Sequence, residues 1–227
     1  MFVLYFVSLY IDLPEIFIFH EGYANDPTIE NKDTNTPTFA ILRCFVNTPR
    51  WAGVPFIFKA GKALNERKAE MRIQFKNAPA SEFLFESKCP RNELVMRLQP
   101  DEAIYMKTNV KTPGFSSNLI QKELEVNYDE RFFQDEKGSP DAYTRLILDV
   151  LRGKSATFVR EDELRRAWEI FTPLLHTIER EKIKPDIYKC GTRGPAAGDD
   201  FVKRKSGYIR NAAYVFKDGK VMKKSNL

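Results

Sequence analysis

Polar and hydrophobic positions alternate in several short runs of the chain, a pattern typical of half-buried β-strands. In residues 92–100, for example, Leu94, Met96 and Leu98 fall on one side of the run, with Arg97 and Gln99 on the other. The strands predicted in this way lie at residues 38–46, 54–58, 70–75, 92–100, 103–110 and 123–128. Because several such strands follow in succession, they predict a largely antiparallel sheet with one polar face.

The pattern changes to a helical period in the later part of the chain. One helix is predicted to begin at Ser139, as the cap, with Pro140 in its first turn, and to end at Gly153. A second helix is predicted at residues 162–179, with a kink at Pro173. Its apolar stripe is expected to be core rather than a set of cofactor contacts. The stripe consists of Leu164, Trp168, Phe171 and Leu175.

Strands followed by helices predict the α+β class, with a large, mostly antiparallel sheet and helices packed on one face of it. A third, short helix is expected at residues 200–205, followed by a polar and aromatic segment at residues 208–216. Residues 217–227 are basic and are expected to form a frayed tail. Residues 22–28 are rich in turn formers and predict a surface loop.

The 227 residues suffice for one large domain, and 43% of them are hydrophobic, as in ordinary globular proteins. The net charge of +5 favours an anionic partner such as a metabolite phosphate, a dinucleotide or a nucleic acid. Cys44, Cys89 and Cys190 are far apart and odd in number. They argue against a disulfide framework or a zinc site and indicate a reducing compartment. His20 and His176 do not form a metal-ligand pair, so no metal site is predicted.

The amino-terminal segment, residues 1–21, is apolar but is interrupted by Asp12, Pro14 and Glu15. The apolar run is too short to span a bilayer, and it lacks the basic start and cleavage site of a signal peptide. A buried strand, or a start created by truncation or a mistaken gene model, is favoured over a signal or membrane role.

The stretch from Arg50 to Phe75 combines two turn signals with a group of five cations that follows Phe58. The turn at Ala60-Gly61-Lys62 allows a close approach of the backbone to a ligand. The cations are Lys59, Lys62, Arg67, Lys68 and Arg72. Such a turn suits a phosphate-bearing ligand, because Arg binds phosphate bidentately and Lys acts as a point charge. The alternative is a hairpin with solvated charges.

Longer motifs carry a resemblance to a known family. They include RWAGVPF from Arg50, GKALNERK from Gly61, RNEL from Arg91, PDAYTRLILD from Pro140, IFTPLLH from Ile170 and RGP from Arg193. Together they resemble the carboxyl-terminal half of glucose-6-phosphate dehydrogenase over residues 22–216, which would form one α+β domain between the apolar segment 1–21 and the basic tail 217–227.

The resemblance implies hydride transfer from C1 of glucose 6-phosphate to NADP, which gives 6-phosphogluconolactone and NADPH in the pentose phosphate pathway. Lys62 and Arg67 match family positions that bind the sugar phosphate. Eukaryotic members also hold a second, structural NADP in this half. The matching positions are Lys59, Lys68, Arg72, Arg97, Gln99, Tyr105, Lys107 and Arg193. The family further implies a homodimer or tetramer formed through the sheet, and a cytoplasmic location.

The chain departs from the family pattern at three positions of the structural NADP site. Lys59 stands where an arginine is usual, Arg210 where an aromatic residue is common, and Phe216 where a tryptophan often stacks, while Tyr214 keeps its ring. The site is therefore expected to be partly remodelled.

The catalytic segments of the family are missing from the 227 residues. There is no G-x-G-x-x-G fingerprint and no segment aspartate-histidine-tyrosine-leucine-glycine-lysine. His176 is expected to be a partly buried helical histidine rather than a base. We therefore predict no catalytic residue in this chain and no activity of the chain alone.

Two alternatives remain open at this point. A truncated paralogue could bind NADP or dimerise with a complete enzyme without catalysing the reaction. A basic nucleic-acid-binding module is the more remote alternative, since no RNP, KH or helix-turn-helix signature is present. The favoured prediction includes neither a nucleic-acid partner nor a membrane partner.

Overall fold

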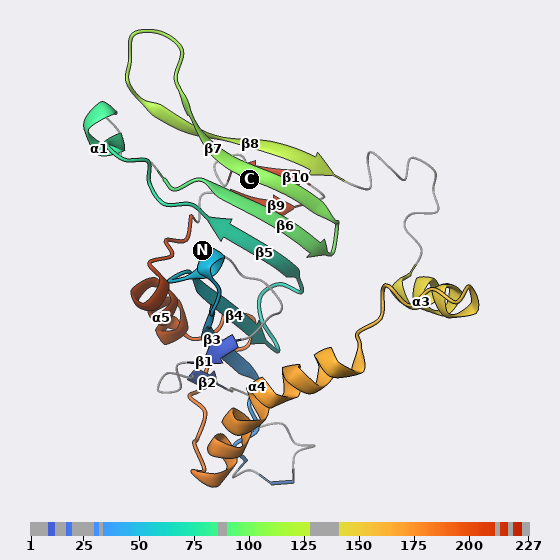
Figure 1. The fold of residues 1–227 in the computed structure, drawn as a ribbon. Helices are drawn as coiled ribbons and strands as arrows, with labels where there is room; N and C mark the ends of the chain where they lie inside the picture. The colour runs from blue at the N-terminus through green and yellow to red at the C-terminus, as the bar shows by residue number, and fades with distance from the viewer. Residues whose placement is uncertain are drawn as a thin grey trace.

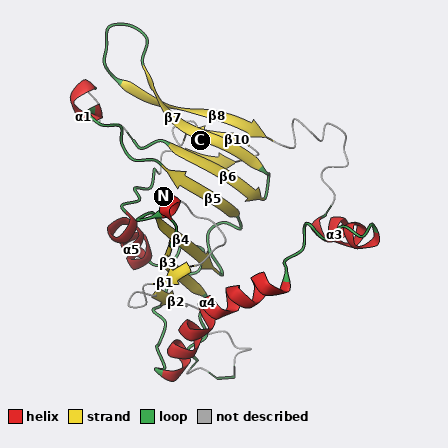
Figure 2. Ribbon diagram, in the orientation of Figure 1, coloured by secondary structure: helices red, strands yellow, loops and turns green. Residues whose placement is uncertain are grey.

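Two antiparallel four-stranded sheets and a hairpin form the framework of the computed structural model (Figure 1, Figure 2). The structure describes residues 9–11, 17–19, 30–31, 34–85, 90–127, 141–211, 214–217 and 220–223. The first sheet contains β1 (Leu9–Ile11), β2 (Phe17–Phe19), β3 (Phe39–Val46) and β4 (Pro55–Gly61). The second contains β5 (Ala69–Gln74), β6 (Glu93–Gln99), β7 (Ala103–Lys111) and β8 (Leu119–Asn127), in that order. The hairpin consists of β9 (Tyr214–Lys217) and β10 (Lys220–Lys223).

The helices follow the strands of the second sheet in the chain, apart from two short early turns. These turns are η1 (Pro49–Trp51) and α1 (Ser81–Leu84). The longer helices are α3 (Ala142–Leu151), α4 (Glu161–Arg180) and α5 (Ala196–Ser206). The predicted α+β fold with antiparallel strands is confirmed. The strands divide into separate sheets because the segment between Gly61 and Ala69 leaves the first sheet as an irregular loop before β5 begins.

Local capping sets the helix bounds. The Asp141 carboxylate accepts a hydrogen bond from the Tyr143 amide at 3.0 Å, so α3 begins at Ala142. The predicted cap at Ser139 lies outside the described residues. Helix α4 continues through Pro173 to Arg180. Helix α5 begins four residues before the predicted start at 200, and it ends at Ser206, followed by Gly207, whose φ of 68° suits a glycine.

The main core lies between the first sheet and α5, which packs against β3 and β4. Phe39 and Ile41 of β3 meet Phe201 and Val202 of α5, with Tyr188 closing one side. Successive side chains of a strand point to opposite faces, so Phe39 and Ile41 enter this core while Cys44 and Val46 enter a second cluster on the other face of β3. This core positions α5, and with it the loop that precedes the helix.

The prediction that the stripe of α4 is core is wrong for most of its members. Leu164, Trp168 and Leu175 are exposed, with Trp168 at 58%. The buried residues of α4 are Leu174 and Ile178, which pack against Leu42 of β3. The helical period of the sequence predicts an apolar stripe, but α4 contacts the sheet through residues that lie beside that stripe. Helix α3 buries none of its residues and stands apart from both sheets in Figure 1.

The register of the second sheet gives it one largely charged face, with Val95 and Ala103 buried among the charged residues, and one apolar face. The charged face is defined by Glu70, Arg72, Gln74, Glu93, Arg97, Tyr105, Lys107, Glu123 and Glu125. The apolar face is defined by Met71, Ile73, Leu94, Met96, Ile104, Met106, Leu124 and Val126. The charged face therefore suits polar or ionic contacts, and the apolar face suits hydrophobic contacts.

Candidate functional site

A cavity of about 930 Å³ lies between α5, the end of β4 and the charged face of the second sheet. Nine Lys and Arg residues line it, against four Asp and Glu residues. The basic residues are Lys59, Arg67, Lys68, Arg72, Arg97, Lys107, Arg193, Lys203 and Arg210. The volume is in the range of small-molecule and cofactor sites, and the excess of positive charge favours an anionic ligand.

Glu93 is the centre of a buried polar network at the back of this cavity. Its Oε2 atom accepts a hydrogen bond from Nη1 of Arg72 at 3.0 Å and lies 3.4 Å from Nζ of Lys107. Its Oε1 atom accepts a hydrogen bond from the Tyr208 hydroxyl at 2.9 Å. The Glu93 and Lys107 side chains are each only 2% exposed. Burial lowers the pKa of Lys107, and the Glu93 carboxylate partly offsets that effect. The network fixes the cations in place.

Glu70 forms a second, overlapping ion-pair group on β5. Arg72 donates to both of its carboxylate oxygens, at 2.8 and 3.1 Å, and Lys68 lies 3.1 Å from Oε1. Burial alone would raise the pKa of Glu70, but the interactions with Arg72 and Lys68 outweigh it and hold the pKa at about 2. Arg72 therefore bridges two carboxylates, and its planar guanidinium is held in one orientation.

Asp199 lies on the opposite wall, near the start of α5, and faces three cations. Its Oδ1 atom lies 3.3 Å from Nζ of Lys59 and 3.7 Å from Nη2 of Arg193. Burial lowers the pKa of Lys59 most, Asp199 offsets part of this, and the nearby Arg193 and Arg210 lower it further. Burial and then Arg193 likewise lower the pKa of Arg210. One carboxylate thus faces more positive charge than it can neutralise.

The Nε atom of Arg193 is buried and has no hydrogen-bond partner among the described residues. Leaving a buried donor unpaired is costly, and native structures usually satisfy such groups. Arg193 is placed by Gly194, whose φ of 98° requires a glycine, and by the loop that leads into α5. The buried Nε–H donor of Arg193 therefore suits an anion bound near Asp199.

The segment from Gly207 to Asn211 forms the remaining wall. The Gln74 amide group makes two hydrogen bonds to the backbone of Ile209, at 2.8 and 3.0 Å, and Arg91 donates to the carbonyl oxygen of Gly207 at 2.6 Å. These bonds tie the end of α5 to the second sheet. They also place Tyr208 and Arg210 at the cavity.

The structure brings together eight of the ten ligand-contact residues predicted from the sequence. Those that line the cavity are Lys59, Arg67, Lys68, Arg72, Arg97, Tyr105, Lys107 and Arg193. Lys62 and Gln99 do not line it; Lys62 follows the end of β4 and Gln99 ends β6, and both are exposed. The side chains of Tyr214 and Phe216 are outside what the structure describes. Asp199, Tyr208 and Glu93 were not predicted from the sequence.

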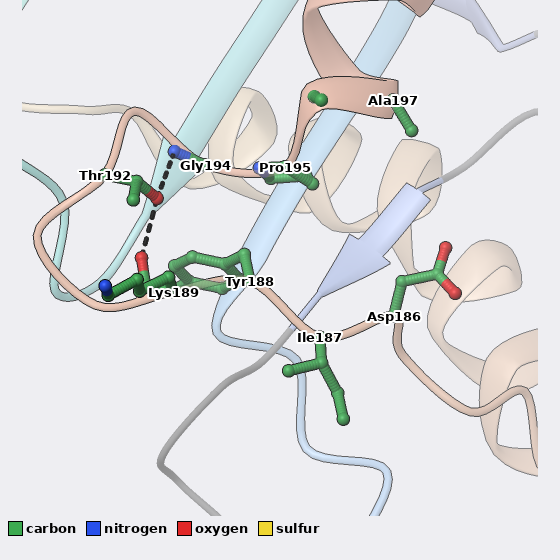
Figure 3. Close-up of a pocket in the computed structure, with 9 residues that line it drawn as sticks. Asp186, Ile187, Tyr188, Lys189, Thr192, Gly194, Pro195 and Ala197 are labelled. Carbon is green, nitrogen blue, oxygen red and sulfur yellow. Dashed lines mark hydrogen bonds between the residues drawn. The ribbon is translucent and has the colours of Figure 1, made fainter.

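Two further hollows are less suited to anion chemistry. Figure 3 shows one of about 420 Å³ at the start of α5, where the Thr192 hydroxyl donates to the Lys189 carbonyl oxygen at 2.6 Å. Its charged lining residues are Asp186 and Lys189. The other, of about 800 Å³, follows one side of α4 around Trp168 and includes His176, which is exposed.

Two cysteines, Cys44 and Cys190, lie in the described part of the chain. Cys44 is buried, and burial raises the pKa of its thiol to about 12. Cys190 is exposed and free, while Cys89 lies outside the described residues. Within the described ranges, no group of three His, Cys, Asp or Glu residues could hold a metal ion. None of the helices in the described part of the chain has both the length and the apolar character to cross a membrane.

A family model matches residues 15–211 of the chain, and its description is "Glucose-6-phosphate dehydrogenase, C-terminal domain". The chain is 51% identical over 199 residues to the cytoplasmic isoform of glucose-6-phosphate 1-dehydrogenase from Solanum tuberosum. It is 52% identical over 194 residues to glucose-6-phosphate 1-dehydrogenase from Dictyostelium discoideum. The matches cover 87% and 85% of this chain but 38% of each relative, so the chain spans about two fifths of their length.

Solved structures agree with the sequence comparison. A glucose-6-phosphate dehydrogenase in complex with its substrate glucose-6-phosphate superposes with a TM-score of 0.80 at 39% identity, over 89% of this chain and 43% of that chain. Glucose-6-phosphate 1-dehydrogenase from Mycobacterium avium superposes with a TM-score of 0.70 at 25% identity, over 86% of this chain and 40% of that chain.

Proposed function

The chain belongs to the glucose-6-phosphate dehydrogenase C-terminal domain family, and from this membership we propose that it is the carboxyl-terminal domain of an NADP-dependent enzyme that oxidises glucose 6-phosphate. In this function it supplies contacts to the sugar phosphate, a structural NADP site and a subunit interface. Relatives named as cytoplasmic isoforms support a cytoplasmic location.

The observation that carries the NADP proposal is the gathering of Lys59, Arg193 and Arg210 around the single carboxylate of Asp199. A phosphate group there would relieve the repulsion among the three cations and accept a hydrogen bond from Nε of Arg193. Arg72, Arg97, Lys107 and Tyr105 would meet the other parts of the dinucleotide, with Lys68 at the rim. Gln99 remains a proposed contact at the end of β6.

Lys62 and Arg67 are proposed to bind the phosphate of glucose 6-phosphate. They lie in one loop between β4 and β5, and both are exposed. Arg67 also borders the cationic cavity, so the sugar-phosphate site and the NADP site would be neighbours. A dianion held by two cations is favourable where water is partly excluded.

The NADP proposal is tested by titrating NADP into the purified 227-residue chain in a calorimeter. We expect saturable binding that weakens at least tenfold in Arg193→Ala, because a charge-assisted contact is lost. Arg165→Ala, an exposed arginine paired with Glu161 on α4, is the matched control and should bind as the wild type does. A wild-type chain that does not bind NADP contradicts the proposal.

The chain alone is proposed not to produce NADPH from glucose 6-phosphate and NADP, because the dinucleotide fingerprint and the catalytic histidine segment are missing from its sequence. The ultraviolet absorbance of NADPH measures this directly. NADPH production by the purified chain, free of any longer subunit, would overturn it.

The apolar face of the second sheet supports a homodimer. Leu124 is 65% exposed there, beside Ile104 and Val126, and a contiguous apolar patch of this kind marks an interaction surface. The second candidate function, a non-catalytic subunit that pairs with a complete enzyme, would use the same face. Co-purification with a longer dehydrogenase subunit separates it from self-association.

A further inference from the structure

The loop from Gly61 to Asn65 is held by backbone hydrogen bonds to two remote segments. The Lys62 amide donates to the carbonyl oxygen of Thr38 at 2.8 Å. The Asn65 amide donates to the carbonyl oxygen of Thr192 at 2.9 Å, and the Gly191 amide donates to that of Ala63 at 2.8 Å. The loop that carries Lys62 is therefore built against a segment more than a hundred residues later in the chain.

Tyr188 is the side chain that closes this arrangement. Its hydroxyl donates to the carbonyl oxygen of Lys62 at 2.7 Å and lies 3.3 Å from both the carbonyl and hydroxyl oxygens of Thr38. Its ring lies 5.6 Å from the Phe39 ring, centroid to centroid, and the residue is 5% exposed. Tyr188 and Thr192 belong to the loop before α5 that is drawn in Figure 3.

The loop needs such support because its backbone is strained. Ala63, directly after Lys62, has a φ of 49°, which is unfavourable for a residue with a Cβ atom. Strained conformations of this kind persist only where the surroundings determine them. On the side of the later segment, this backbone conformation is held by the hydroxyl of Tyr188 and by the two hydrogen bonds to residues 191 and 192.

We propose that Tyr188 is a positioning residue for Lys62: its hydroxyl fixes the backbone conformation from which the Lys62 ammonium group meets the phosphate of a phosphorylated sugar. The inference rests on the proposed function, in which Lys62 binds that phosphate. Tyr188 touches the carbonyl group of Lys62 and does not line the cationic cavity. Its loss should therefore affect the sugar phosphate and spare the dinucleotide.

The test uses Tyr188→Phe in the full 227-residue chain, since this change removes the hydroxyl and keeps the ring against Phe39. The matched control is Tyr143→Phe, because Tyr143 is exposed on α3. We expect glucose 6-phosphate to bind about tenfold more weakly to Tyr188→Phe, with NADP affinity unchanged, because one buried hydrogen bond is lost. Amide hydrogen exchange at residues 62–65 should accelerate about tenfold relative to the amide of Val95 in β6.

A double-mutant cycle with Lys62→Ala makes the role specific. If Tyr188 acts through Lys62, the double variant should bind glucose 6-phosphate no more weakly than Lys62→Ala alone. Equal glucose 6-phosphate affinity in Tyr188→Phe and the wild type, or equal acceleration of exchange at residues 62–65 and at Val95, overturns the inference. A wild-type chain that does not bind glucose 6-phosphate instead overturns the proposed sugar-phosphate site.

Discussion

The two faces of the second sheet reverse the usual distribution of polarity. On the charged face, Glu93 and Lys107 are almost fully buried. On the apolar face, Leu124 and Val126 are exposed to solvent. Residues of the two faces alternate along the same strands, as Glu123 and Leu124 do in β8, so strand propensity does not explain the difference. What differs is the element that covers each face.

The comparison teaches that the cover on each face, rather than the strands themselves, decides which residues of this sheet are buried. The charged face is covered by α5 and the segment after it, which leave a cationic cavity between. The apolar face has no comparable cover among the described residues, and its composition suits a second protein surface.

Glu93→Ala should have the largest effect on the charged face. It leaves Lys107 buried without its carboxylate partner and removes one of the two carboxylates that Arg72 contacts. We expect the free energy of unfolding to fall by about 4 kcal/mol, because an uncompensated buried charge is strongly destabilising. Urea denaturation measures the change. The double variant Glu93→Leu with Lys107→Met should recover much of it; a loss as large as in Glu93→Ala would mean that charge is not the cause.

Acid should destabilise the protein through Glu70. Its pKa of about 2 lies below the ordinary value of 4.5. The stabilisation from the ionised carboxylate is therefore fully present above pH 4.5 and is lost as the pH falls from about 4.5 to about 2. The contribution is about 3 kcal/mol. Unfolding measured against pH should show a flatter acid limb in Glu70→Gln, and an unchanged limb would contradict the assignment.

Leu124→Lys should break association through the apolar face. Two copies related by a two-fold axis would place like charges in one interface, so we expect dimerisation to weaken by about 2 kcal/mol, roughly thirtyfold. The stability of the monomer should change little, because Leu124 is exposed. Sedimentation equilibrium measures the association. Ile147→Lys on α3 is the control outside the face, and equal weakening in both variants would remove the support for this interface.

Lys59→Arg, which alters the cavity wall opposite the charged face, should have the smallest effect and should strengthen ligand binding. An arginine can contact a phosphate with two donors where a lysine supplies a point charge. We expect NADP affinity to rise about threefold, which corresponds to roughly 0.7 kcal/mol. Calorimetry measures this, with Lys154→Arg, exposed and distant from the cavity, as the control. Weaker binding of NADP by Lys59→Arg would show that the site depends on lysine.

The fold class and most strands could be predicted from the sequence because alternation of polarity is local. The strands around residues 92–100 and 103–110 appear as β6 and β7 with nearly the predicted bounds. The helices were also predicted, but the partner of each helix was not. The period of α4 identifies an apolar stripe, whereas the choice of Leu174 and Ile178 as the buried pair depends on how the helix meets β3.

Most of the cationic residues that line the cavity, though not Lys203, could be predicted through the family resemblance, whereas their anionic partners could not. Glu93 meets Tyr208, and Lys59 meets Asp199, across more than a hundred residues. Pairings over such distances depend on the assembled fold, and no local pattern reports them. The pair Asp199-Asp200 at the start of a helix was the available signal, since acidic residues there usually complement the helix dipole.

Phe39 imposes an order on the assembly of the protein. An added Cβ atom would lie 2.5 Å from the Phe39 ring at Gly61 and 2.4 Å from it at Gly194, so the backbone at both glycines packs directly against this ring. Gly194 is synthesised long after Gly61, and contacts of high sequence separation form slowly. During translation, β3 and β4 can pair while the later segment is still in the ribosome. The loop from Gly61 to Asn65, which is hydrogen-bonded to residues 191 and 192, would therefore be among the last parts of the nascent chain to mature.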